Sequence, residues 1–124
     1  MKKVELAVTV FEALSSGEER LSTCGIMDFE AGSSEETSFI KMIYLYLSHG
    51  KSVIITPNTS LSHTIHNTNG VVHISSRQHH SVHGSASSFS HAKIEDDGIA
   101  YSLKGGKKVD LIRNFVANDI YLVL

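Results

Sequence analysis

The sequence has one cysteine, one proline and no long apolar run. A single thiol, Cys24, excludes an internal disulfide and any zinc site built from several cysteines, which favours a reducing compartment. The longest apolar stretch, residues 39–47, is interrupted by Lys41 and is far shorter than the roughly 20 residues that cross a bilayer. The basic start meets an acid at Glu5, which does not fit a signal peptide. We therefore expect a cytoplasmic protein without a membrane segment.

Length and charge exclude further classes of protein. The 124 residues suffice for one domain, so we expect a single globular domain over residues 1–124. Disordered chains combine low hydrophobicity with high net charge, whereas this chain is 41% hydrophobic with a net charge of −2. The small net charge also argues against a strongly basic nucleic-acid-binding protein.

Acidic residues are missing from the middle of the chain. Residues 37–94 contain none, although they hold four lysine or arginine residues and all eight histidines. Residues 1–36 carry eight acids against three bases, and residues 95–124 carry five acids against four bases. The small net charge thus conceals a positive, histidine-rich middle region, which is the compositional feature that most needs an explanation.

The first 30 residues predict a strand hairpin. Apolar residues alternate from Val4 to Val10, which is typical of a strand buried on one face. Residues 21–30 are expected to form a second strand, joined to the first through residues 17–20. In the rival interpretation, residues 10–14 form a short helix.

A helix over residues 34–49 has the clearest signals. Ser33 and Glu36 match a capping box, and Gly50 is placed to end the helix in the left-handed conformation. Apolar residues recur between them at helical spacing: Phe39, Ile40, Ile43, Tyr44 and Leu47. The next segment, residues 51–56, predicts a strand closed by Pro57 and buried on both faces.

The second half of the chain indicates short strands and turns. Asp97-Gly98 predicts a tight hairpin with positive φ at both positions, and Gly105-Gly106 predicts another. Residues 109–116 fit either a helix or a strand, and the alternation of Ile120, Leu122 and Leu124 predicts a docked strand at the C-terminus. The expected fold is α+β, a mainly antiparallel sheet with one principal amphipathic helix, about residues 34–49, packed on it.

A candidate anion-binding strand lies in the positive region. Side chains two residues apart on a strand point the same way, so an extended segment over residues 73–83 would align six polar side chains at intervals of about 7 Å. Guanidinium, imidazole and hydroxyl groups together suit a phosphate or sulfate group. The alternative is the solvated face of an edge strand, and a break near Gln78 would divide the set. The six candidate ligand-binding residues are His73, Ser75, Arg77, His79, Ser81 and His83.

Two functions fit these residues. The first is a small non-enzymatic binding protein of the inhibitor, immunity or ligand-sequestering type that phages and mobile elements commonly encode. It would engage an anionic partner such as a nucleotide, RNA or an acidic protein surface through the middle region. The alternative is a metal-independent ribonuclease in which His79 and His83 transfer protons and Arg77 holds the phosphate, with His73 as a substitute for either histidine.

Other motifs carry less chemistry. His63 and His66 lack a recognised zinc spacing, so no metal site is expected. No phosphate-loop or dinucleotide signature is present, and no cofactor is expected. Residues 104–108 hold three lysines around two glycines, which suits a hairpin tip whose charged side chains prevent pairing with the strand edge of another molecule. Exposed strand edges elsewhere would allow pairing with a second copy to form a homo-oligomer.

Overall fold

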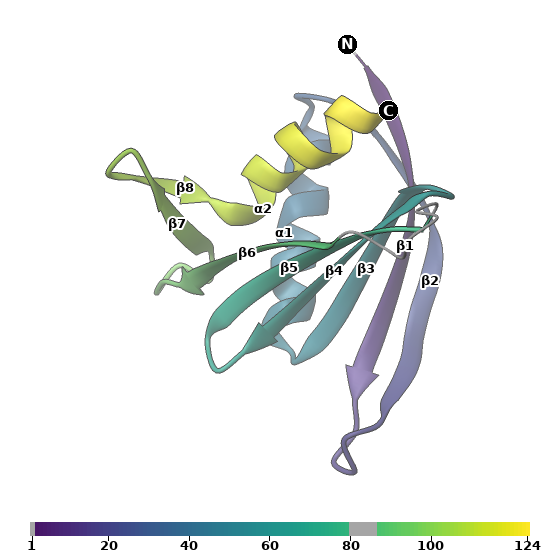
Figure 1. Ribbon diagram of the computed structural model, residues 1–124, viewed down its shortest axis with the longest axis vertical. Helices are drawn as coiled ribbons and strands as arrows, with labels where there is room; N and C mark the ends of the chain where they lie inside the picture. The colour runs from purple at the N-terminus through teal and green to yellow at the C-terminus, as the bar shows by residue number, and fades with distance from the viewer. Residues whose placement is uncertain (1, 80–86) are drawn as a thin grey trace.

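The computed structural model describes residues 2–79 and 87–124, which form one antiparallel sheet with helices on one face (Figure 1). The strands are β1 (Lys3–Ala13), β2 (Glu19–Glu30), β3 (Lys51–Asn58), β4 (Leu61–Thr68), β5 (Val71–Gln78), β6 (Ser87–Ile94), β7 (Ala100–Lys104) and β8 (Lys107–Asp110). The helices are α1 (Ser34–Ser48) and α2 (Leu111–Phe115), followed by a π-helical turn (Val116–Ile120) and a 3₁₀ turn (Tyr121–Val123).

The strand order is β2-β1-β3-β4-β5-β6-β7-β8, with β2 and β8 at the two edges. The α+β class and the mainly antiparallel sheet are confirmed. The prediction of one principal helix is only partly right, because the short α2 also packs on the sheet. In Figure 1, α1 crosses behind the central strands, and the C-terminal helical segments run beside it. None of the helices in the described ranges is long and apolar enough to cross a membrane.

Tight turns set the register of the strands. The β1–β2 hairpin is confirmed, and it contains a bulge between Val10 and Phe11. Gly105 and Gly106 both have positive φ, as expected of a two-residue hairpin turn. At Asp97-Gly98 only Gly98 does, because the connection is one residue longer than predicted: the Glu95 N–H donates to the carbonyl of Ile99. A third tight turn, which the sequence analysis did not identify, is Asn69-Gly70 between β4 and β5.

The start of α1 uses only half of the expected capping box. The Ser33 hydroxyl accepts the Glu36 N–H at 3.3 Å, as the motif predicts. The Ser33 N–H donates to the carbonyl of Glu30, while the Glu36 carboxylate accepts the hydroxyl of Tyr121. Arg113 lies 3.8 Å from the same carboxylate. Glu36 therefore ties α1 to the C-terminal segments instead of closing its own N-terminus.

The hydrophobic core lies between α1, α2 and one face of the sheet, here named the covered face. Strand alternation directs Val53, Ile55 and Ile65 to this face, where they are fully buried. The opposite face, here named the open face, receives Ile54, which is half-buried. The prediction that this strand is buried on both faces is therefore wrong, since both described helices, α1 and α2, lie on the covered face.

The C-terminus is helical and not the docked strand expected. Ile112, Phe115, Val116 and Ile120 recur at helical spacing and are all buried, whereas Leu122 is 77% exposed. Alternation over three residues was too short to distinguish the two periods. The Lys2 ammonium donates to the carbonyls of Tyr121 and Leu124, which holds the two ends of the chain together.

Candidate functional site

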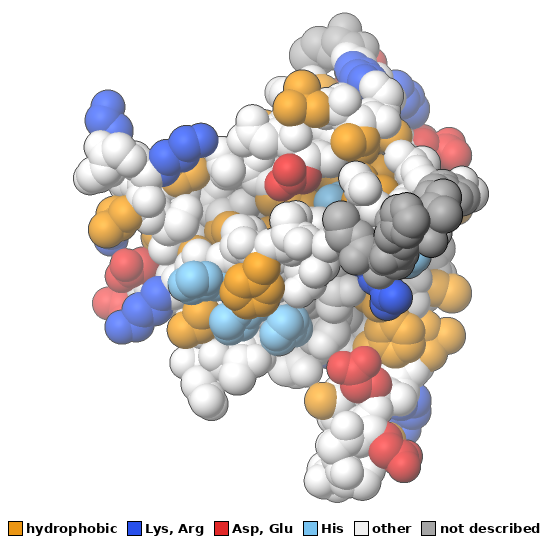
Figure 2. All heavy atoms as spheres, in the orientation of Figure 1, with side chains coloured by type: hydrophobic (Ala, Val, Ile, Leu, Met, Phe, Trp, Pro, Cys, Tyr) orange, Lys and Arg blue, Asp and Glu red, His pale blue; other side chains and the backbone are white. Residues whose placement is uncertain are grey.

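The open face of β4, β5 and β6 combines cations, hydroxyls and aromatic rings. The antiparallel register and strand alternation place one set of side chains from each strand on this face. None of the three strands contains a carboxylate. Figure 2, which looks onto this face, shows histidines gathered beside a hydrophobic side chain. The set comprises Ser62, Thr64 and His66 of β4, His73, Ser75 and Arg77 of β5, and Ser87, Phe89, His91 and Lys93 of β6.

Four rings make continuous contact across the three strands, and we name them the ring cluster: His66, His73, Phe89 and His91. The register pairs His66 with His73 and His73 with His91. The His66 and His73 rings are nearly parallel, with centroids 5.1 Å apart. Phe89 lies 5.1 Å from His73 and 5.9 Å from His91, tilted by 38° to each. Although Phe89 belongs to this cluster, its side chain remains 61% exposed.

The environment of His73 favours its neutral form. Partial desolvation lowers its pKa below 6.5, and the neighbouring His66 and His91 lower it further by repulsion between positive charges. The Nδ1 atom of His73 is buried and has no hydrogen-bond partner within the described residues. At neutral pH this ring therefore acts as a flat, uncharged surface.

Beside the ring cluster lies a hollow of about 400 Å³, which we name the polar hollow. Among the described residues that line it, the basic side chains are Arg77, near the end of β5, and His79. The His79 ring is held in place because its Nε2 lies 2.9 Å from the Ser62 hydroxyl and its backbone N–H donates to the carbonyl of Ser60. Four of the other lining residues present hydroxyl groups on the open face, Ser62, Thr64, Ser75 and Ser87, whereas the hydroxyl of the fifth, Ser76, points to the covered face.

Strand β5 brings together part of the set expected from the sequence. His73, Ser75 and Arg77 share the open face, as the spacing predicts. The strand ends at Gln78, so His79 reaches the hollow from the segment after it. Ser81 and His83 lie outside the described residues. The ribonuclease alternative, which pairs His79 with His83, therefore stays a prediction.

Sequence reasoning missed the partners of β5 in the ring cluster. His66 precedes Asn69 by three residues and His73 follows Gly70 by three, so a hairpin at Asn69-Gly70 places the two histidines opposite each other. An Asn-Gly pair is a strong signal for such a hairpin and could have predicted this contact. Phe89 and His91 depend on the pairing of β6, for which residues 79–86 provide no comparable turn signal.

The ring cluster does not form a metal centre. Within residues 2–79 and 87–124, no three histidine, cysteine or acidic side chains are arranged to hold a metal ion. The histidines of the cluster lie beside one another with their faces in contact, whereas metal binding requires ring nitrogens that converge on one point.

A fifth histidine, His63, lies beneath the polar hollow on the covered face. It is 2% exposed and packs edge-on against Phe115, with the centroids 4.8 Å apart. Its Nδ1 lies 2.6 Å from the hydroxyl of Ser76, while its Nε2 has no partner among the described residues. Burial lowers the pKa of His63 below 6.5. The negative charge of Asp119 acts in the opposite direction, but its effect on this pKa is smaller.

Stability is expected to fall on acidification through His63. Since its pKa in the folded state lies below the 6.5 of the unfolded chain, the unfolded chain takes up a proton first. The stabilisation is complete above about pH 6.5 and declines as the pH falls from there towards the folded-state pKa. When the pH is lowered from about 7.5 to 5, the free energy of unfolding measured by urea titration should fall less for His63→Gln than for wild type.

The control for this prediction is His49→Gln, at an exposed histidine that follows α1. Comparison of the pH profiles of His63→Gln and His49→Gln separates the effect of removing a buried histidine from that of removing an exposed one. Because the lowered pKa of His73 acts in the same direction, the test is the difference between variants and not the total slope. Equal pH profiles for His63→Gln and wild type would contradict the burial of His63 as a neutral base.

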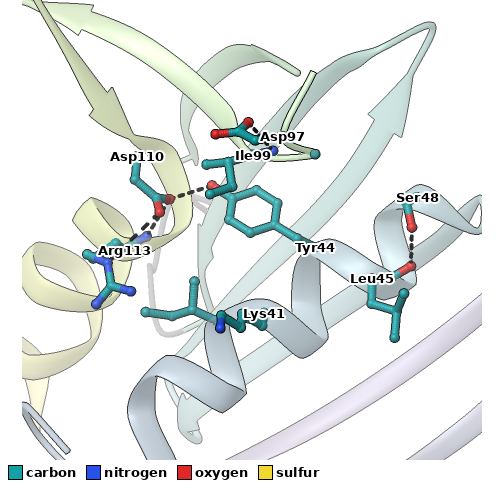
Figure 3. A pocket seen from close by; sticks show the side chains of 10 residues that line it. Lys41, Tyr44, Leu45, Ser48, Asp97, Ile99, Asp110 and Arg113 are labelled. Atoms are coloured by element: carbon teal, nitrogen blue, oxygen red, sulfur yellow. Dashed lines mark hydrogen bonds and ion pairs between the residues drawn. The ribbon is translucent and has the colours of Figure 1, made fainter. Parts of the chain in front are cut away.

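A second pocket, of about 370 Å³, lies on the other side of the molecule between α1, the β6–β7 turn and the start of α2. Figure 3 shows the Tyr44 hydroxyl pointing at Asp110, with Ile99 close to the ring. Burial raises the pKa of the Tyr44 phenol, and the hydrogen bond to Asp110 raises it further. The most deeply placed polar groups of this pocket therefore bind each other and join structural elements.

No protein-family model, curated protein or solved structure matches this chain. Its function is accordingly inferred from the side chains of the open face and their chemistry.

Proposed function

We propose that this chain is a small binding protein that holds an anionic partner on the open face of β4, β5 and β6. It acts by sequestration or inhibition and not by turnover. The observation that carries the proposal is the polar hollow, in which Arg77 and His79 lie among four hydroxyl-bearing side chains of the open face, Ser62, Thr64, Ser75 and Ser87. A guanidinium can donate two parallel hydrogen bonds to a phosphate or carboxylate, and the hydroxyls can donate to its remaining oxygens.

Local charge supports an anionic partner. The strands that form the hollow contain no acid, and residues 37–94 contain none at all, so an approaching anion meets no repulsion from this surface. The carboxylates of the molecule lie towards the two ends of the sequence, where several are paired with lysine or arginine, as in Glu12 with Arg20 and Glu95 with Lys108. The small net charge therefore does not represent the charge of the open face of β4, β5 and β6.

The effect of pH follows from the imidazoles. An imidazole gains a positive charge on acidification, which would add to the charge of Arg77 on this face, and the lowered pKa of His73 places the gain at that ring below pH 6.5. Anion binding through the hollow should therefore strengthen as the pH falls, until loss of stability through His63 limits it.

Arg77→Gln is the direct test. Loss of one charge-assisted contact is expected to weaken binding of inorganic polyphosphate about tenfold and to lower the slope of log affinity against log salt by about 1. Isothermal titration calorimetry at several salt concentrations would measure both quantities. Poly-glutamate, titrated in parallel, distinguishes an acidic polypeptide partner from a phosphate-bearing one.

The matched control is Arg20→Gln, because Arg20 is an exposed arginine on the edge strand β2, outside the polar hollow. This variant should bind polyphosphate with wild-type affinity, apart from a small effect of net charge. Equal affinities of Arg77→Gln and wild type for both polyanions would contradict the proposal. Thermal unfolding of each variant separates a loss of binding from a loss of folding.

A further inference from the structure

We infer that the ring cluster binds the bases of a single-stranded nucleic acid whose phosphates occupy the polar hollow. This inference rests on the proposed function and names the class of its ligand. Proteins that bind single strands combine a positively charged surface with aromatic side chains on which bases stack. Both parts are present here on one face of three adjacent strands.

Phe89 is the ring that a base would contact. Phe89 is 61% exposed on a strand where its neighbours in sequence are serines and a histidine. Packing in the hydrophobic core therefore does not explain a phenylalanine at this position. His73 and His91 contact it from the two positions beside it on β5 and β6, which limits the freedom of the Phe89 ring before a ligand arrives. A ring held in this way loses little conformational entropy when a base stacks on it.

The histidines extend this surface. His66 and His73 lie at 14° to each other, so their faces are already aligned in a stack. An offset or tilted arrangement of π-systems with centroids about 4.5–7 Å apart is favourable, and the contacts within the cluster fall in this range. A flat base placed against Phe89 would continue a stack that the protein has already formed.

The extent of the combined surface suits an oligonucleotide. His73 and Arg77 lie on the same face of β5 and four residues apart, a span of about 13 Å along the strand. Ser75 lies between them and lines the hollow. Phe89 lies opposite Ser75, so the ring cluster and the hollow are continuous. Several linked nucleotides can cover this combined surface, with bases on the rings and phosphates in the hollow.

Two labelled probes of about 12 nucleotides separate stacking from charge: oligothymidylate, and an abasic strand with the same phosphate backbone. Fluorescence anisotropy should show tighter binding of the oligothymidylate by wild type. Phe89→Ala should weaken that binding about tenfold and leave the affinity for the abasic strand unchanged. The control is Leu45→Ala, because Leu45 is 57% exposed on α1, away from the open face, and its replacement should affect neither probe.

Arg77→Gln completes the comparison, because it should weaken binding of both probes. If wild type binds the two probes equally while Arg77→Gln weakens both, stacking is refuted and the anion-binding function remains. If Phe89→Ala weakens the abasic strand as much as the oligothymidylate, the role of Phe89 in base stacking is also refuted. Binding of poly-glutamate in preference to either strand would overturn a nucleic-acid ligand in favour of an acidic polypeptide.

Discussion

Phe115→Ala is expected to lower the free energy of unfolding by about 3–5 kcal/mol, the cost typical of truncating a buried aromatic residue. Phe115 is 2% exposed and lies among the buried residues of the C-terminal helical segments. It also covers one edge of the His63 ring. Truncation would open a cavity beside that histidine and remove the largest apolar side chain of α2.

Urea denaturation of Phe115→Ala and Phe89→Ala makes a matched comparison, because the same side chain is removed at both positions. Phe89 is 61% exposed, so its truncation should change stability by no more than about 0.5 kcal/mol. A loss below about 1 kcal/mol for Phe115→Ala would show that α2 does not pack on the sheet as described. If Phe89→Ala is as stable as wild type, a loss of binding in this variant reflects the ligand site and not unfolding.

Tyr44→Phe removes one oxygen and is expected to cost about 1–3 kcal/mol. The Tyr44 hydroxyl donates to Asp110 at 2.5 Å and accepts the Ile112 N–H at 3.0 Å. That N–H belongs to the first turn of α2, where backbone donors have no partner within the helix. Since Ile112 is fully buried, water cannot replace the lost acceptor.

Tyr101→Phe is the control for this effect, because the Tyr101 hydroxyl bonds Asp97 at a more exposed site, where water can take its place. Its stability in urea should stay within about 0.5 kcal/mol of wild type. Equal stabilities of Tyr44→Phe and wild type would contradict the bridge from α1 to the start of α2.

Local signals predicted the elements that depend on local interactions. The helix that follows Ser33 combines a cap, helical spacing and a terminating glycine, and the structure contains it as α1. The prediction of a C-terminal strand was wrong because packing against the core, and not the alternation of three residues, determines the conformation there. Ile120 is buried among the helical residues before it, whereas Leu122 and Leu124, which completed the alternation, remain 77% and 39% exposed.

In the candidate site, too, local signals predicted some features, whereas others depend on tertiary contacts. The spacing of His73, Ser75 and Arg77 was sufficient to place them on one face of a strand. The ring cluster depends on which residues of β4 and β6 lie opposite β5, and register is a property of pairs of strands. The periodicity of a single strand carries no information on its partners, which is why Phe89 was overlooked.

The strand order also bears on how the molecule folds. Every strand pairing except one joins strands that follow each other in the chain; the exception is β1 with β3, between which β2 and α1 intervene. Successive hairpins close small loops, and the β1–β3 seam must close a longer one at a greater entropic cost. The ring cluster and polar hollow arise from the consecutive strands β4, β5 and β6, so their register is set within one contiguous segment of the chain. The core beneath them is complete only when the seam has joined the N-terminal hairpin to that segment.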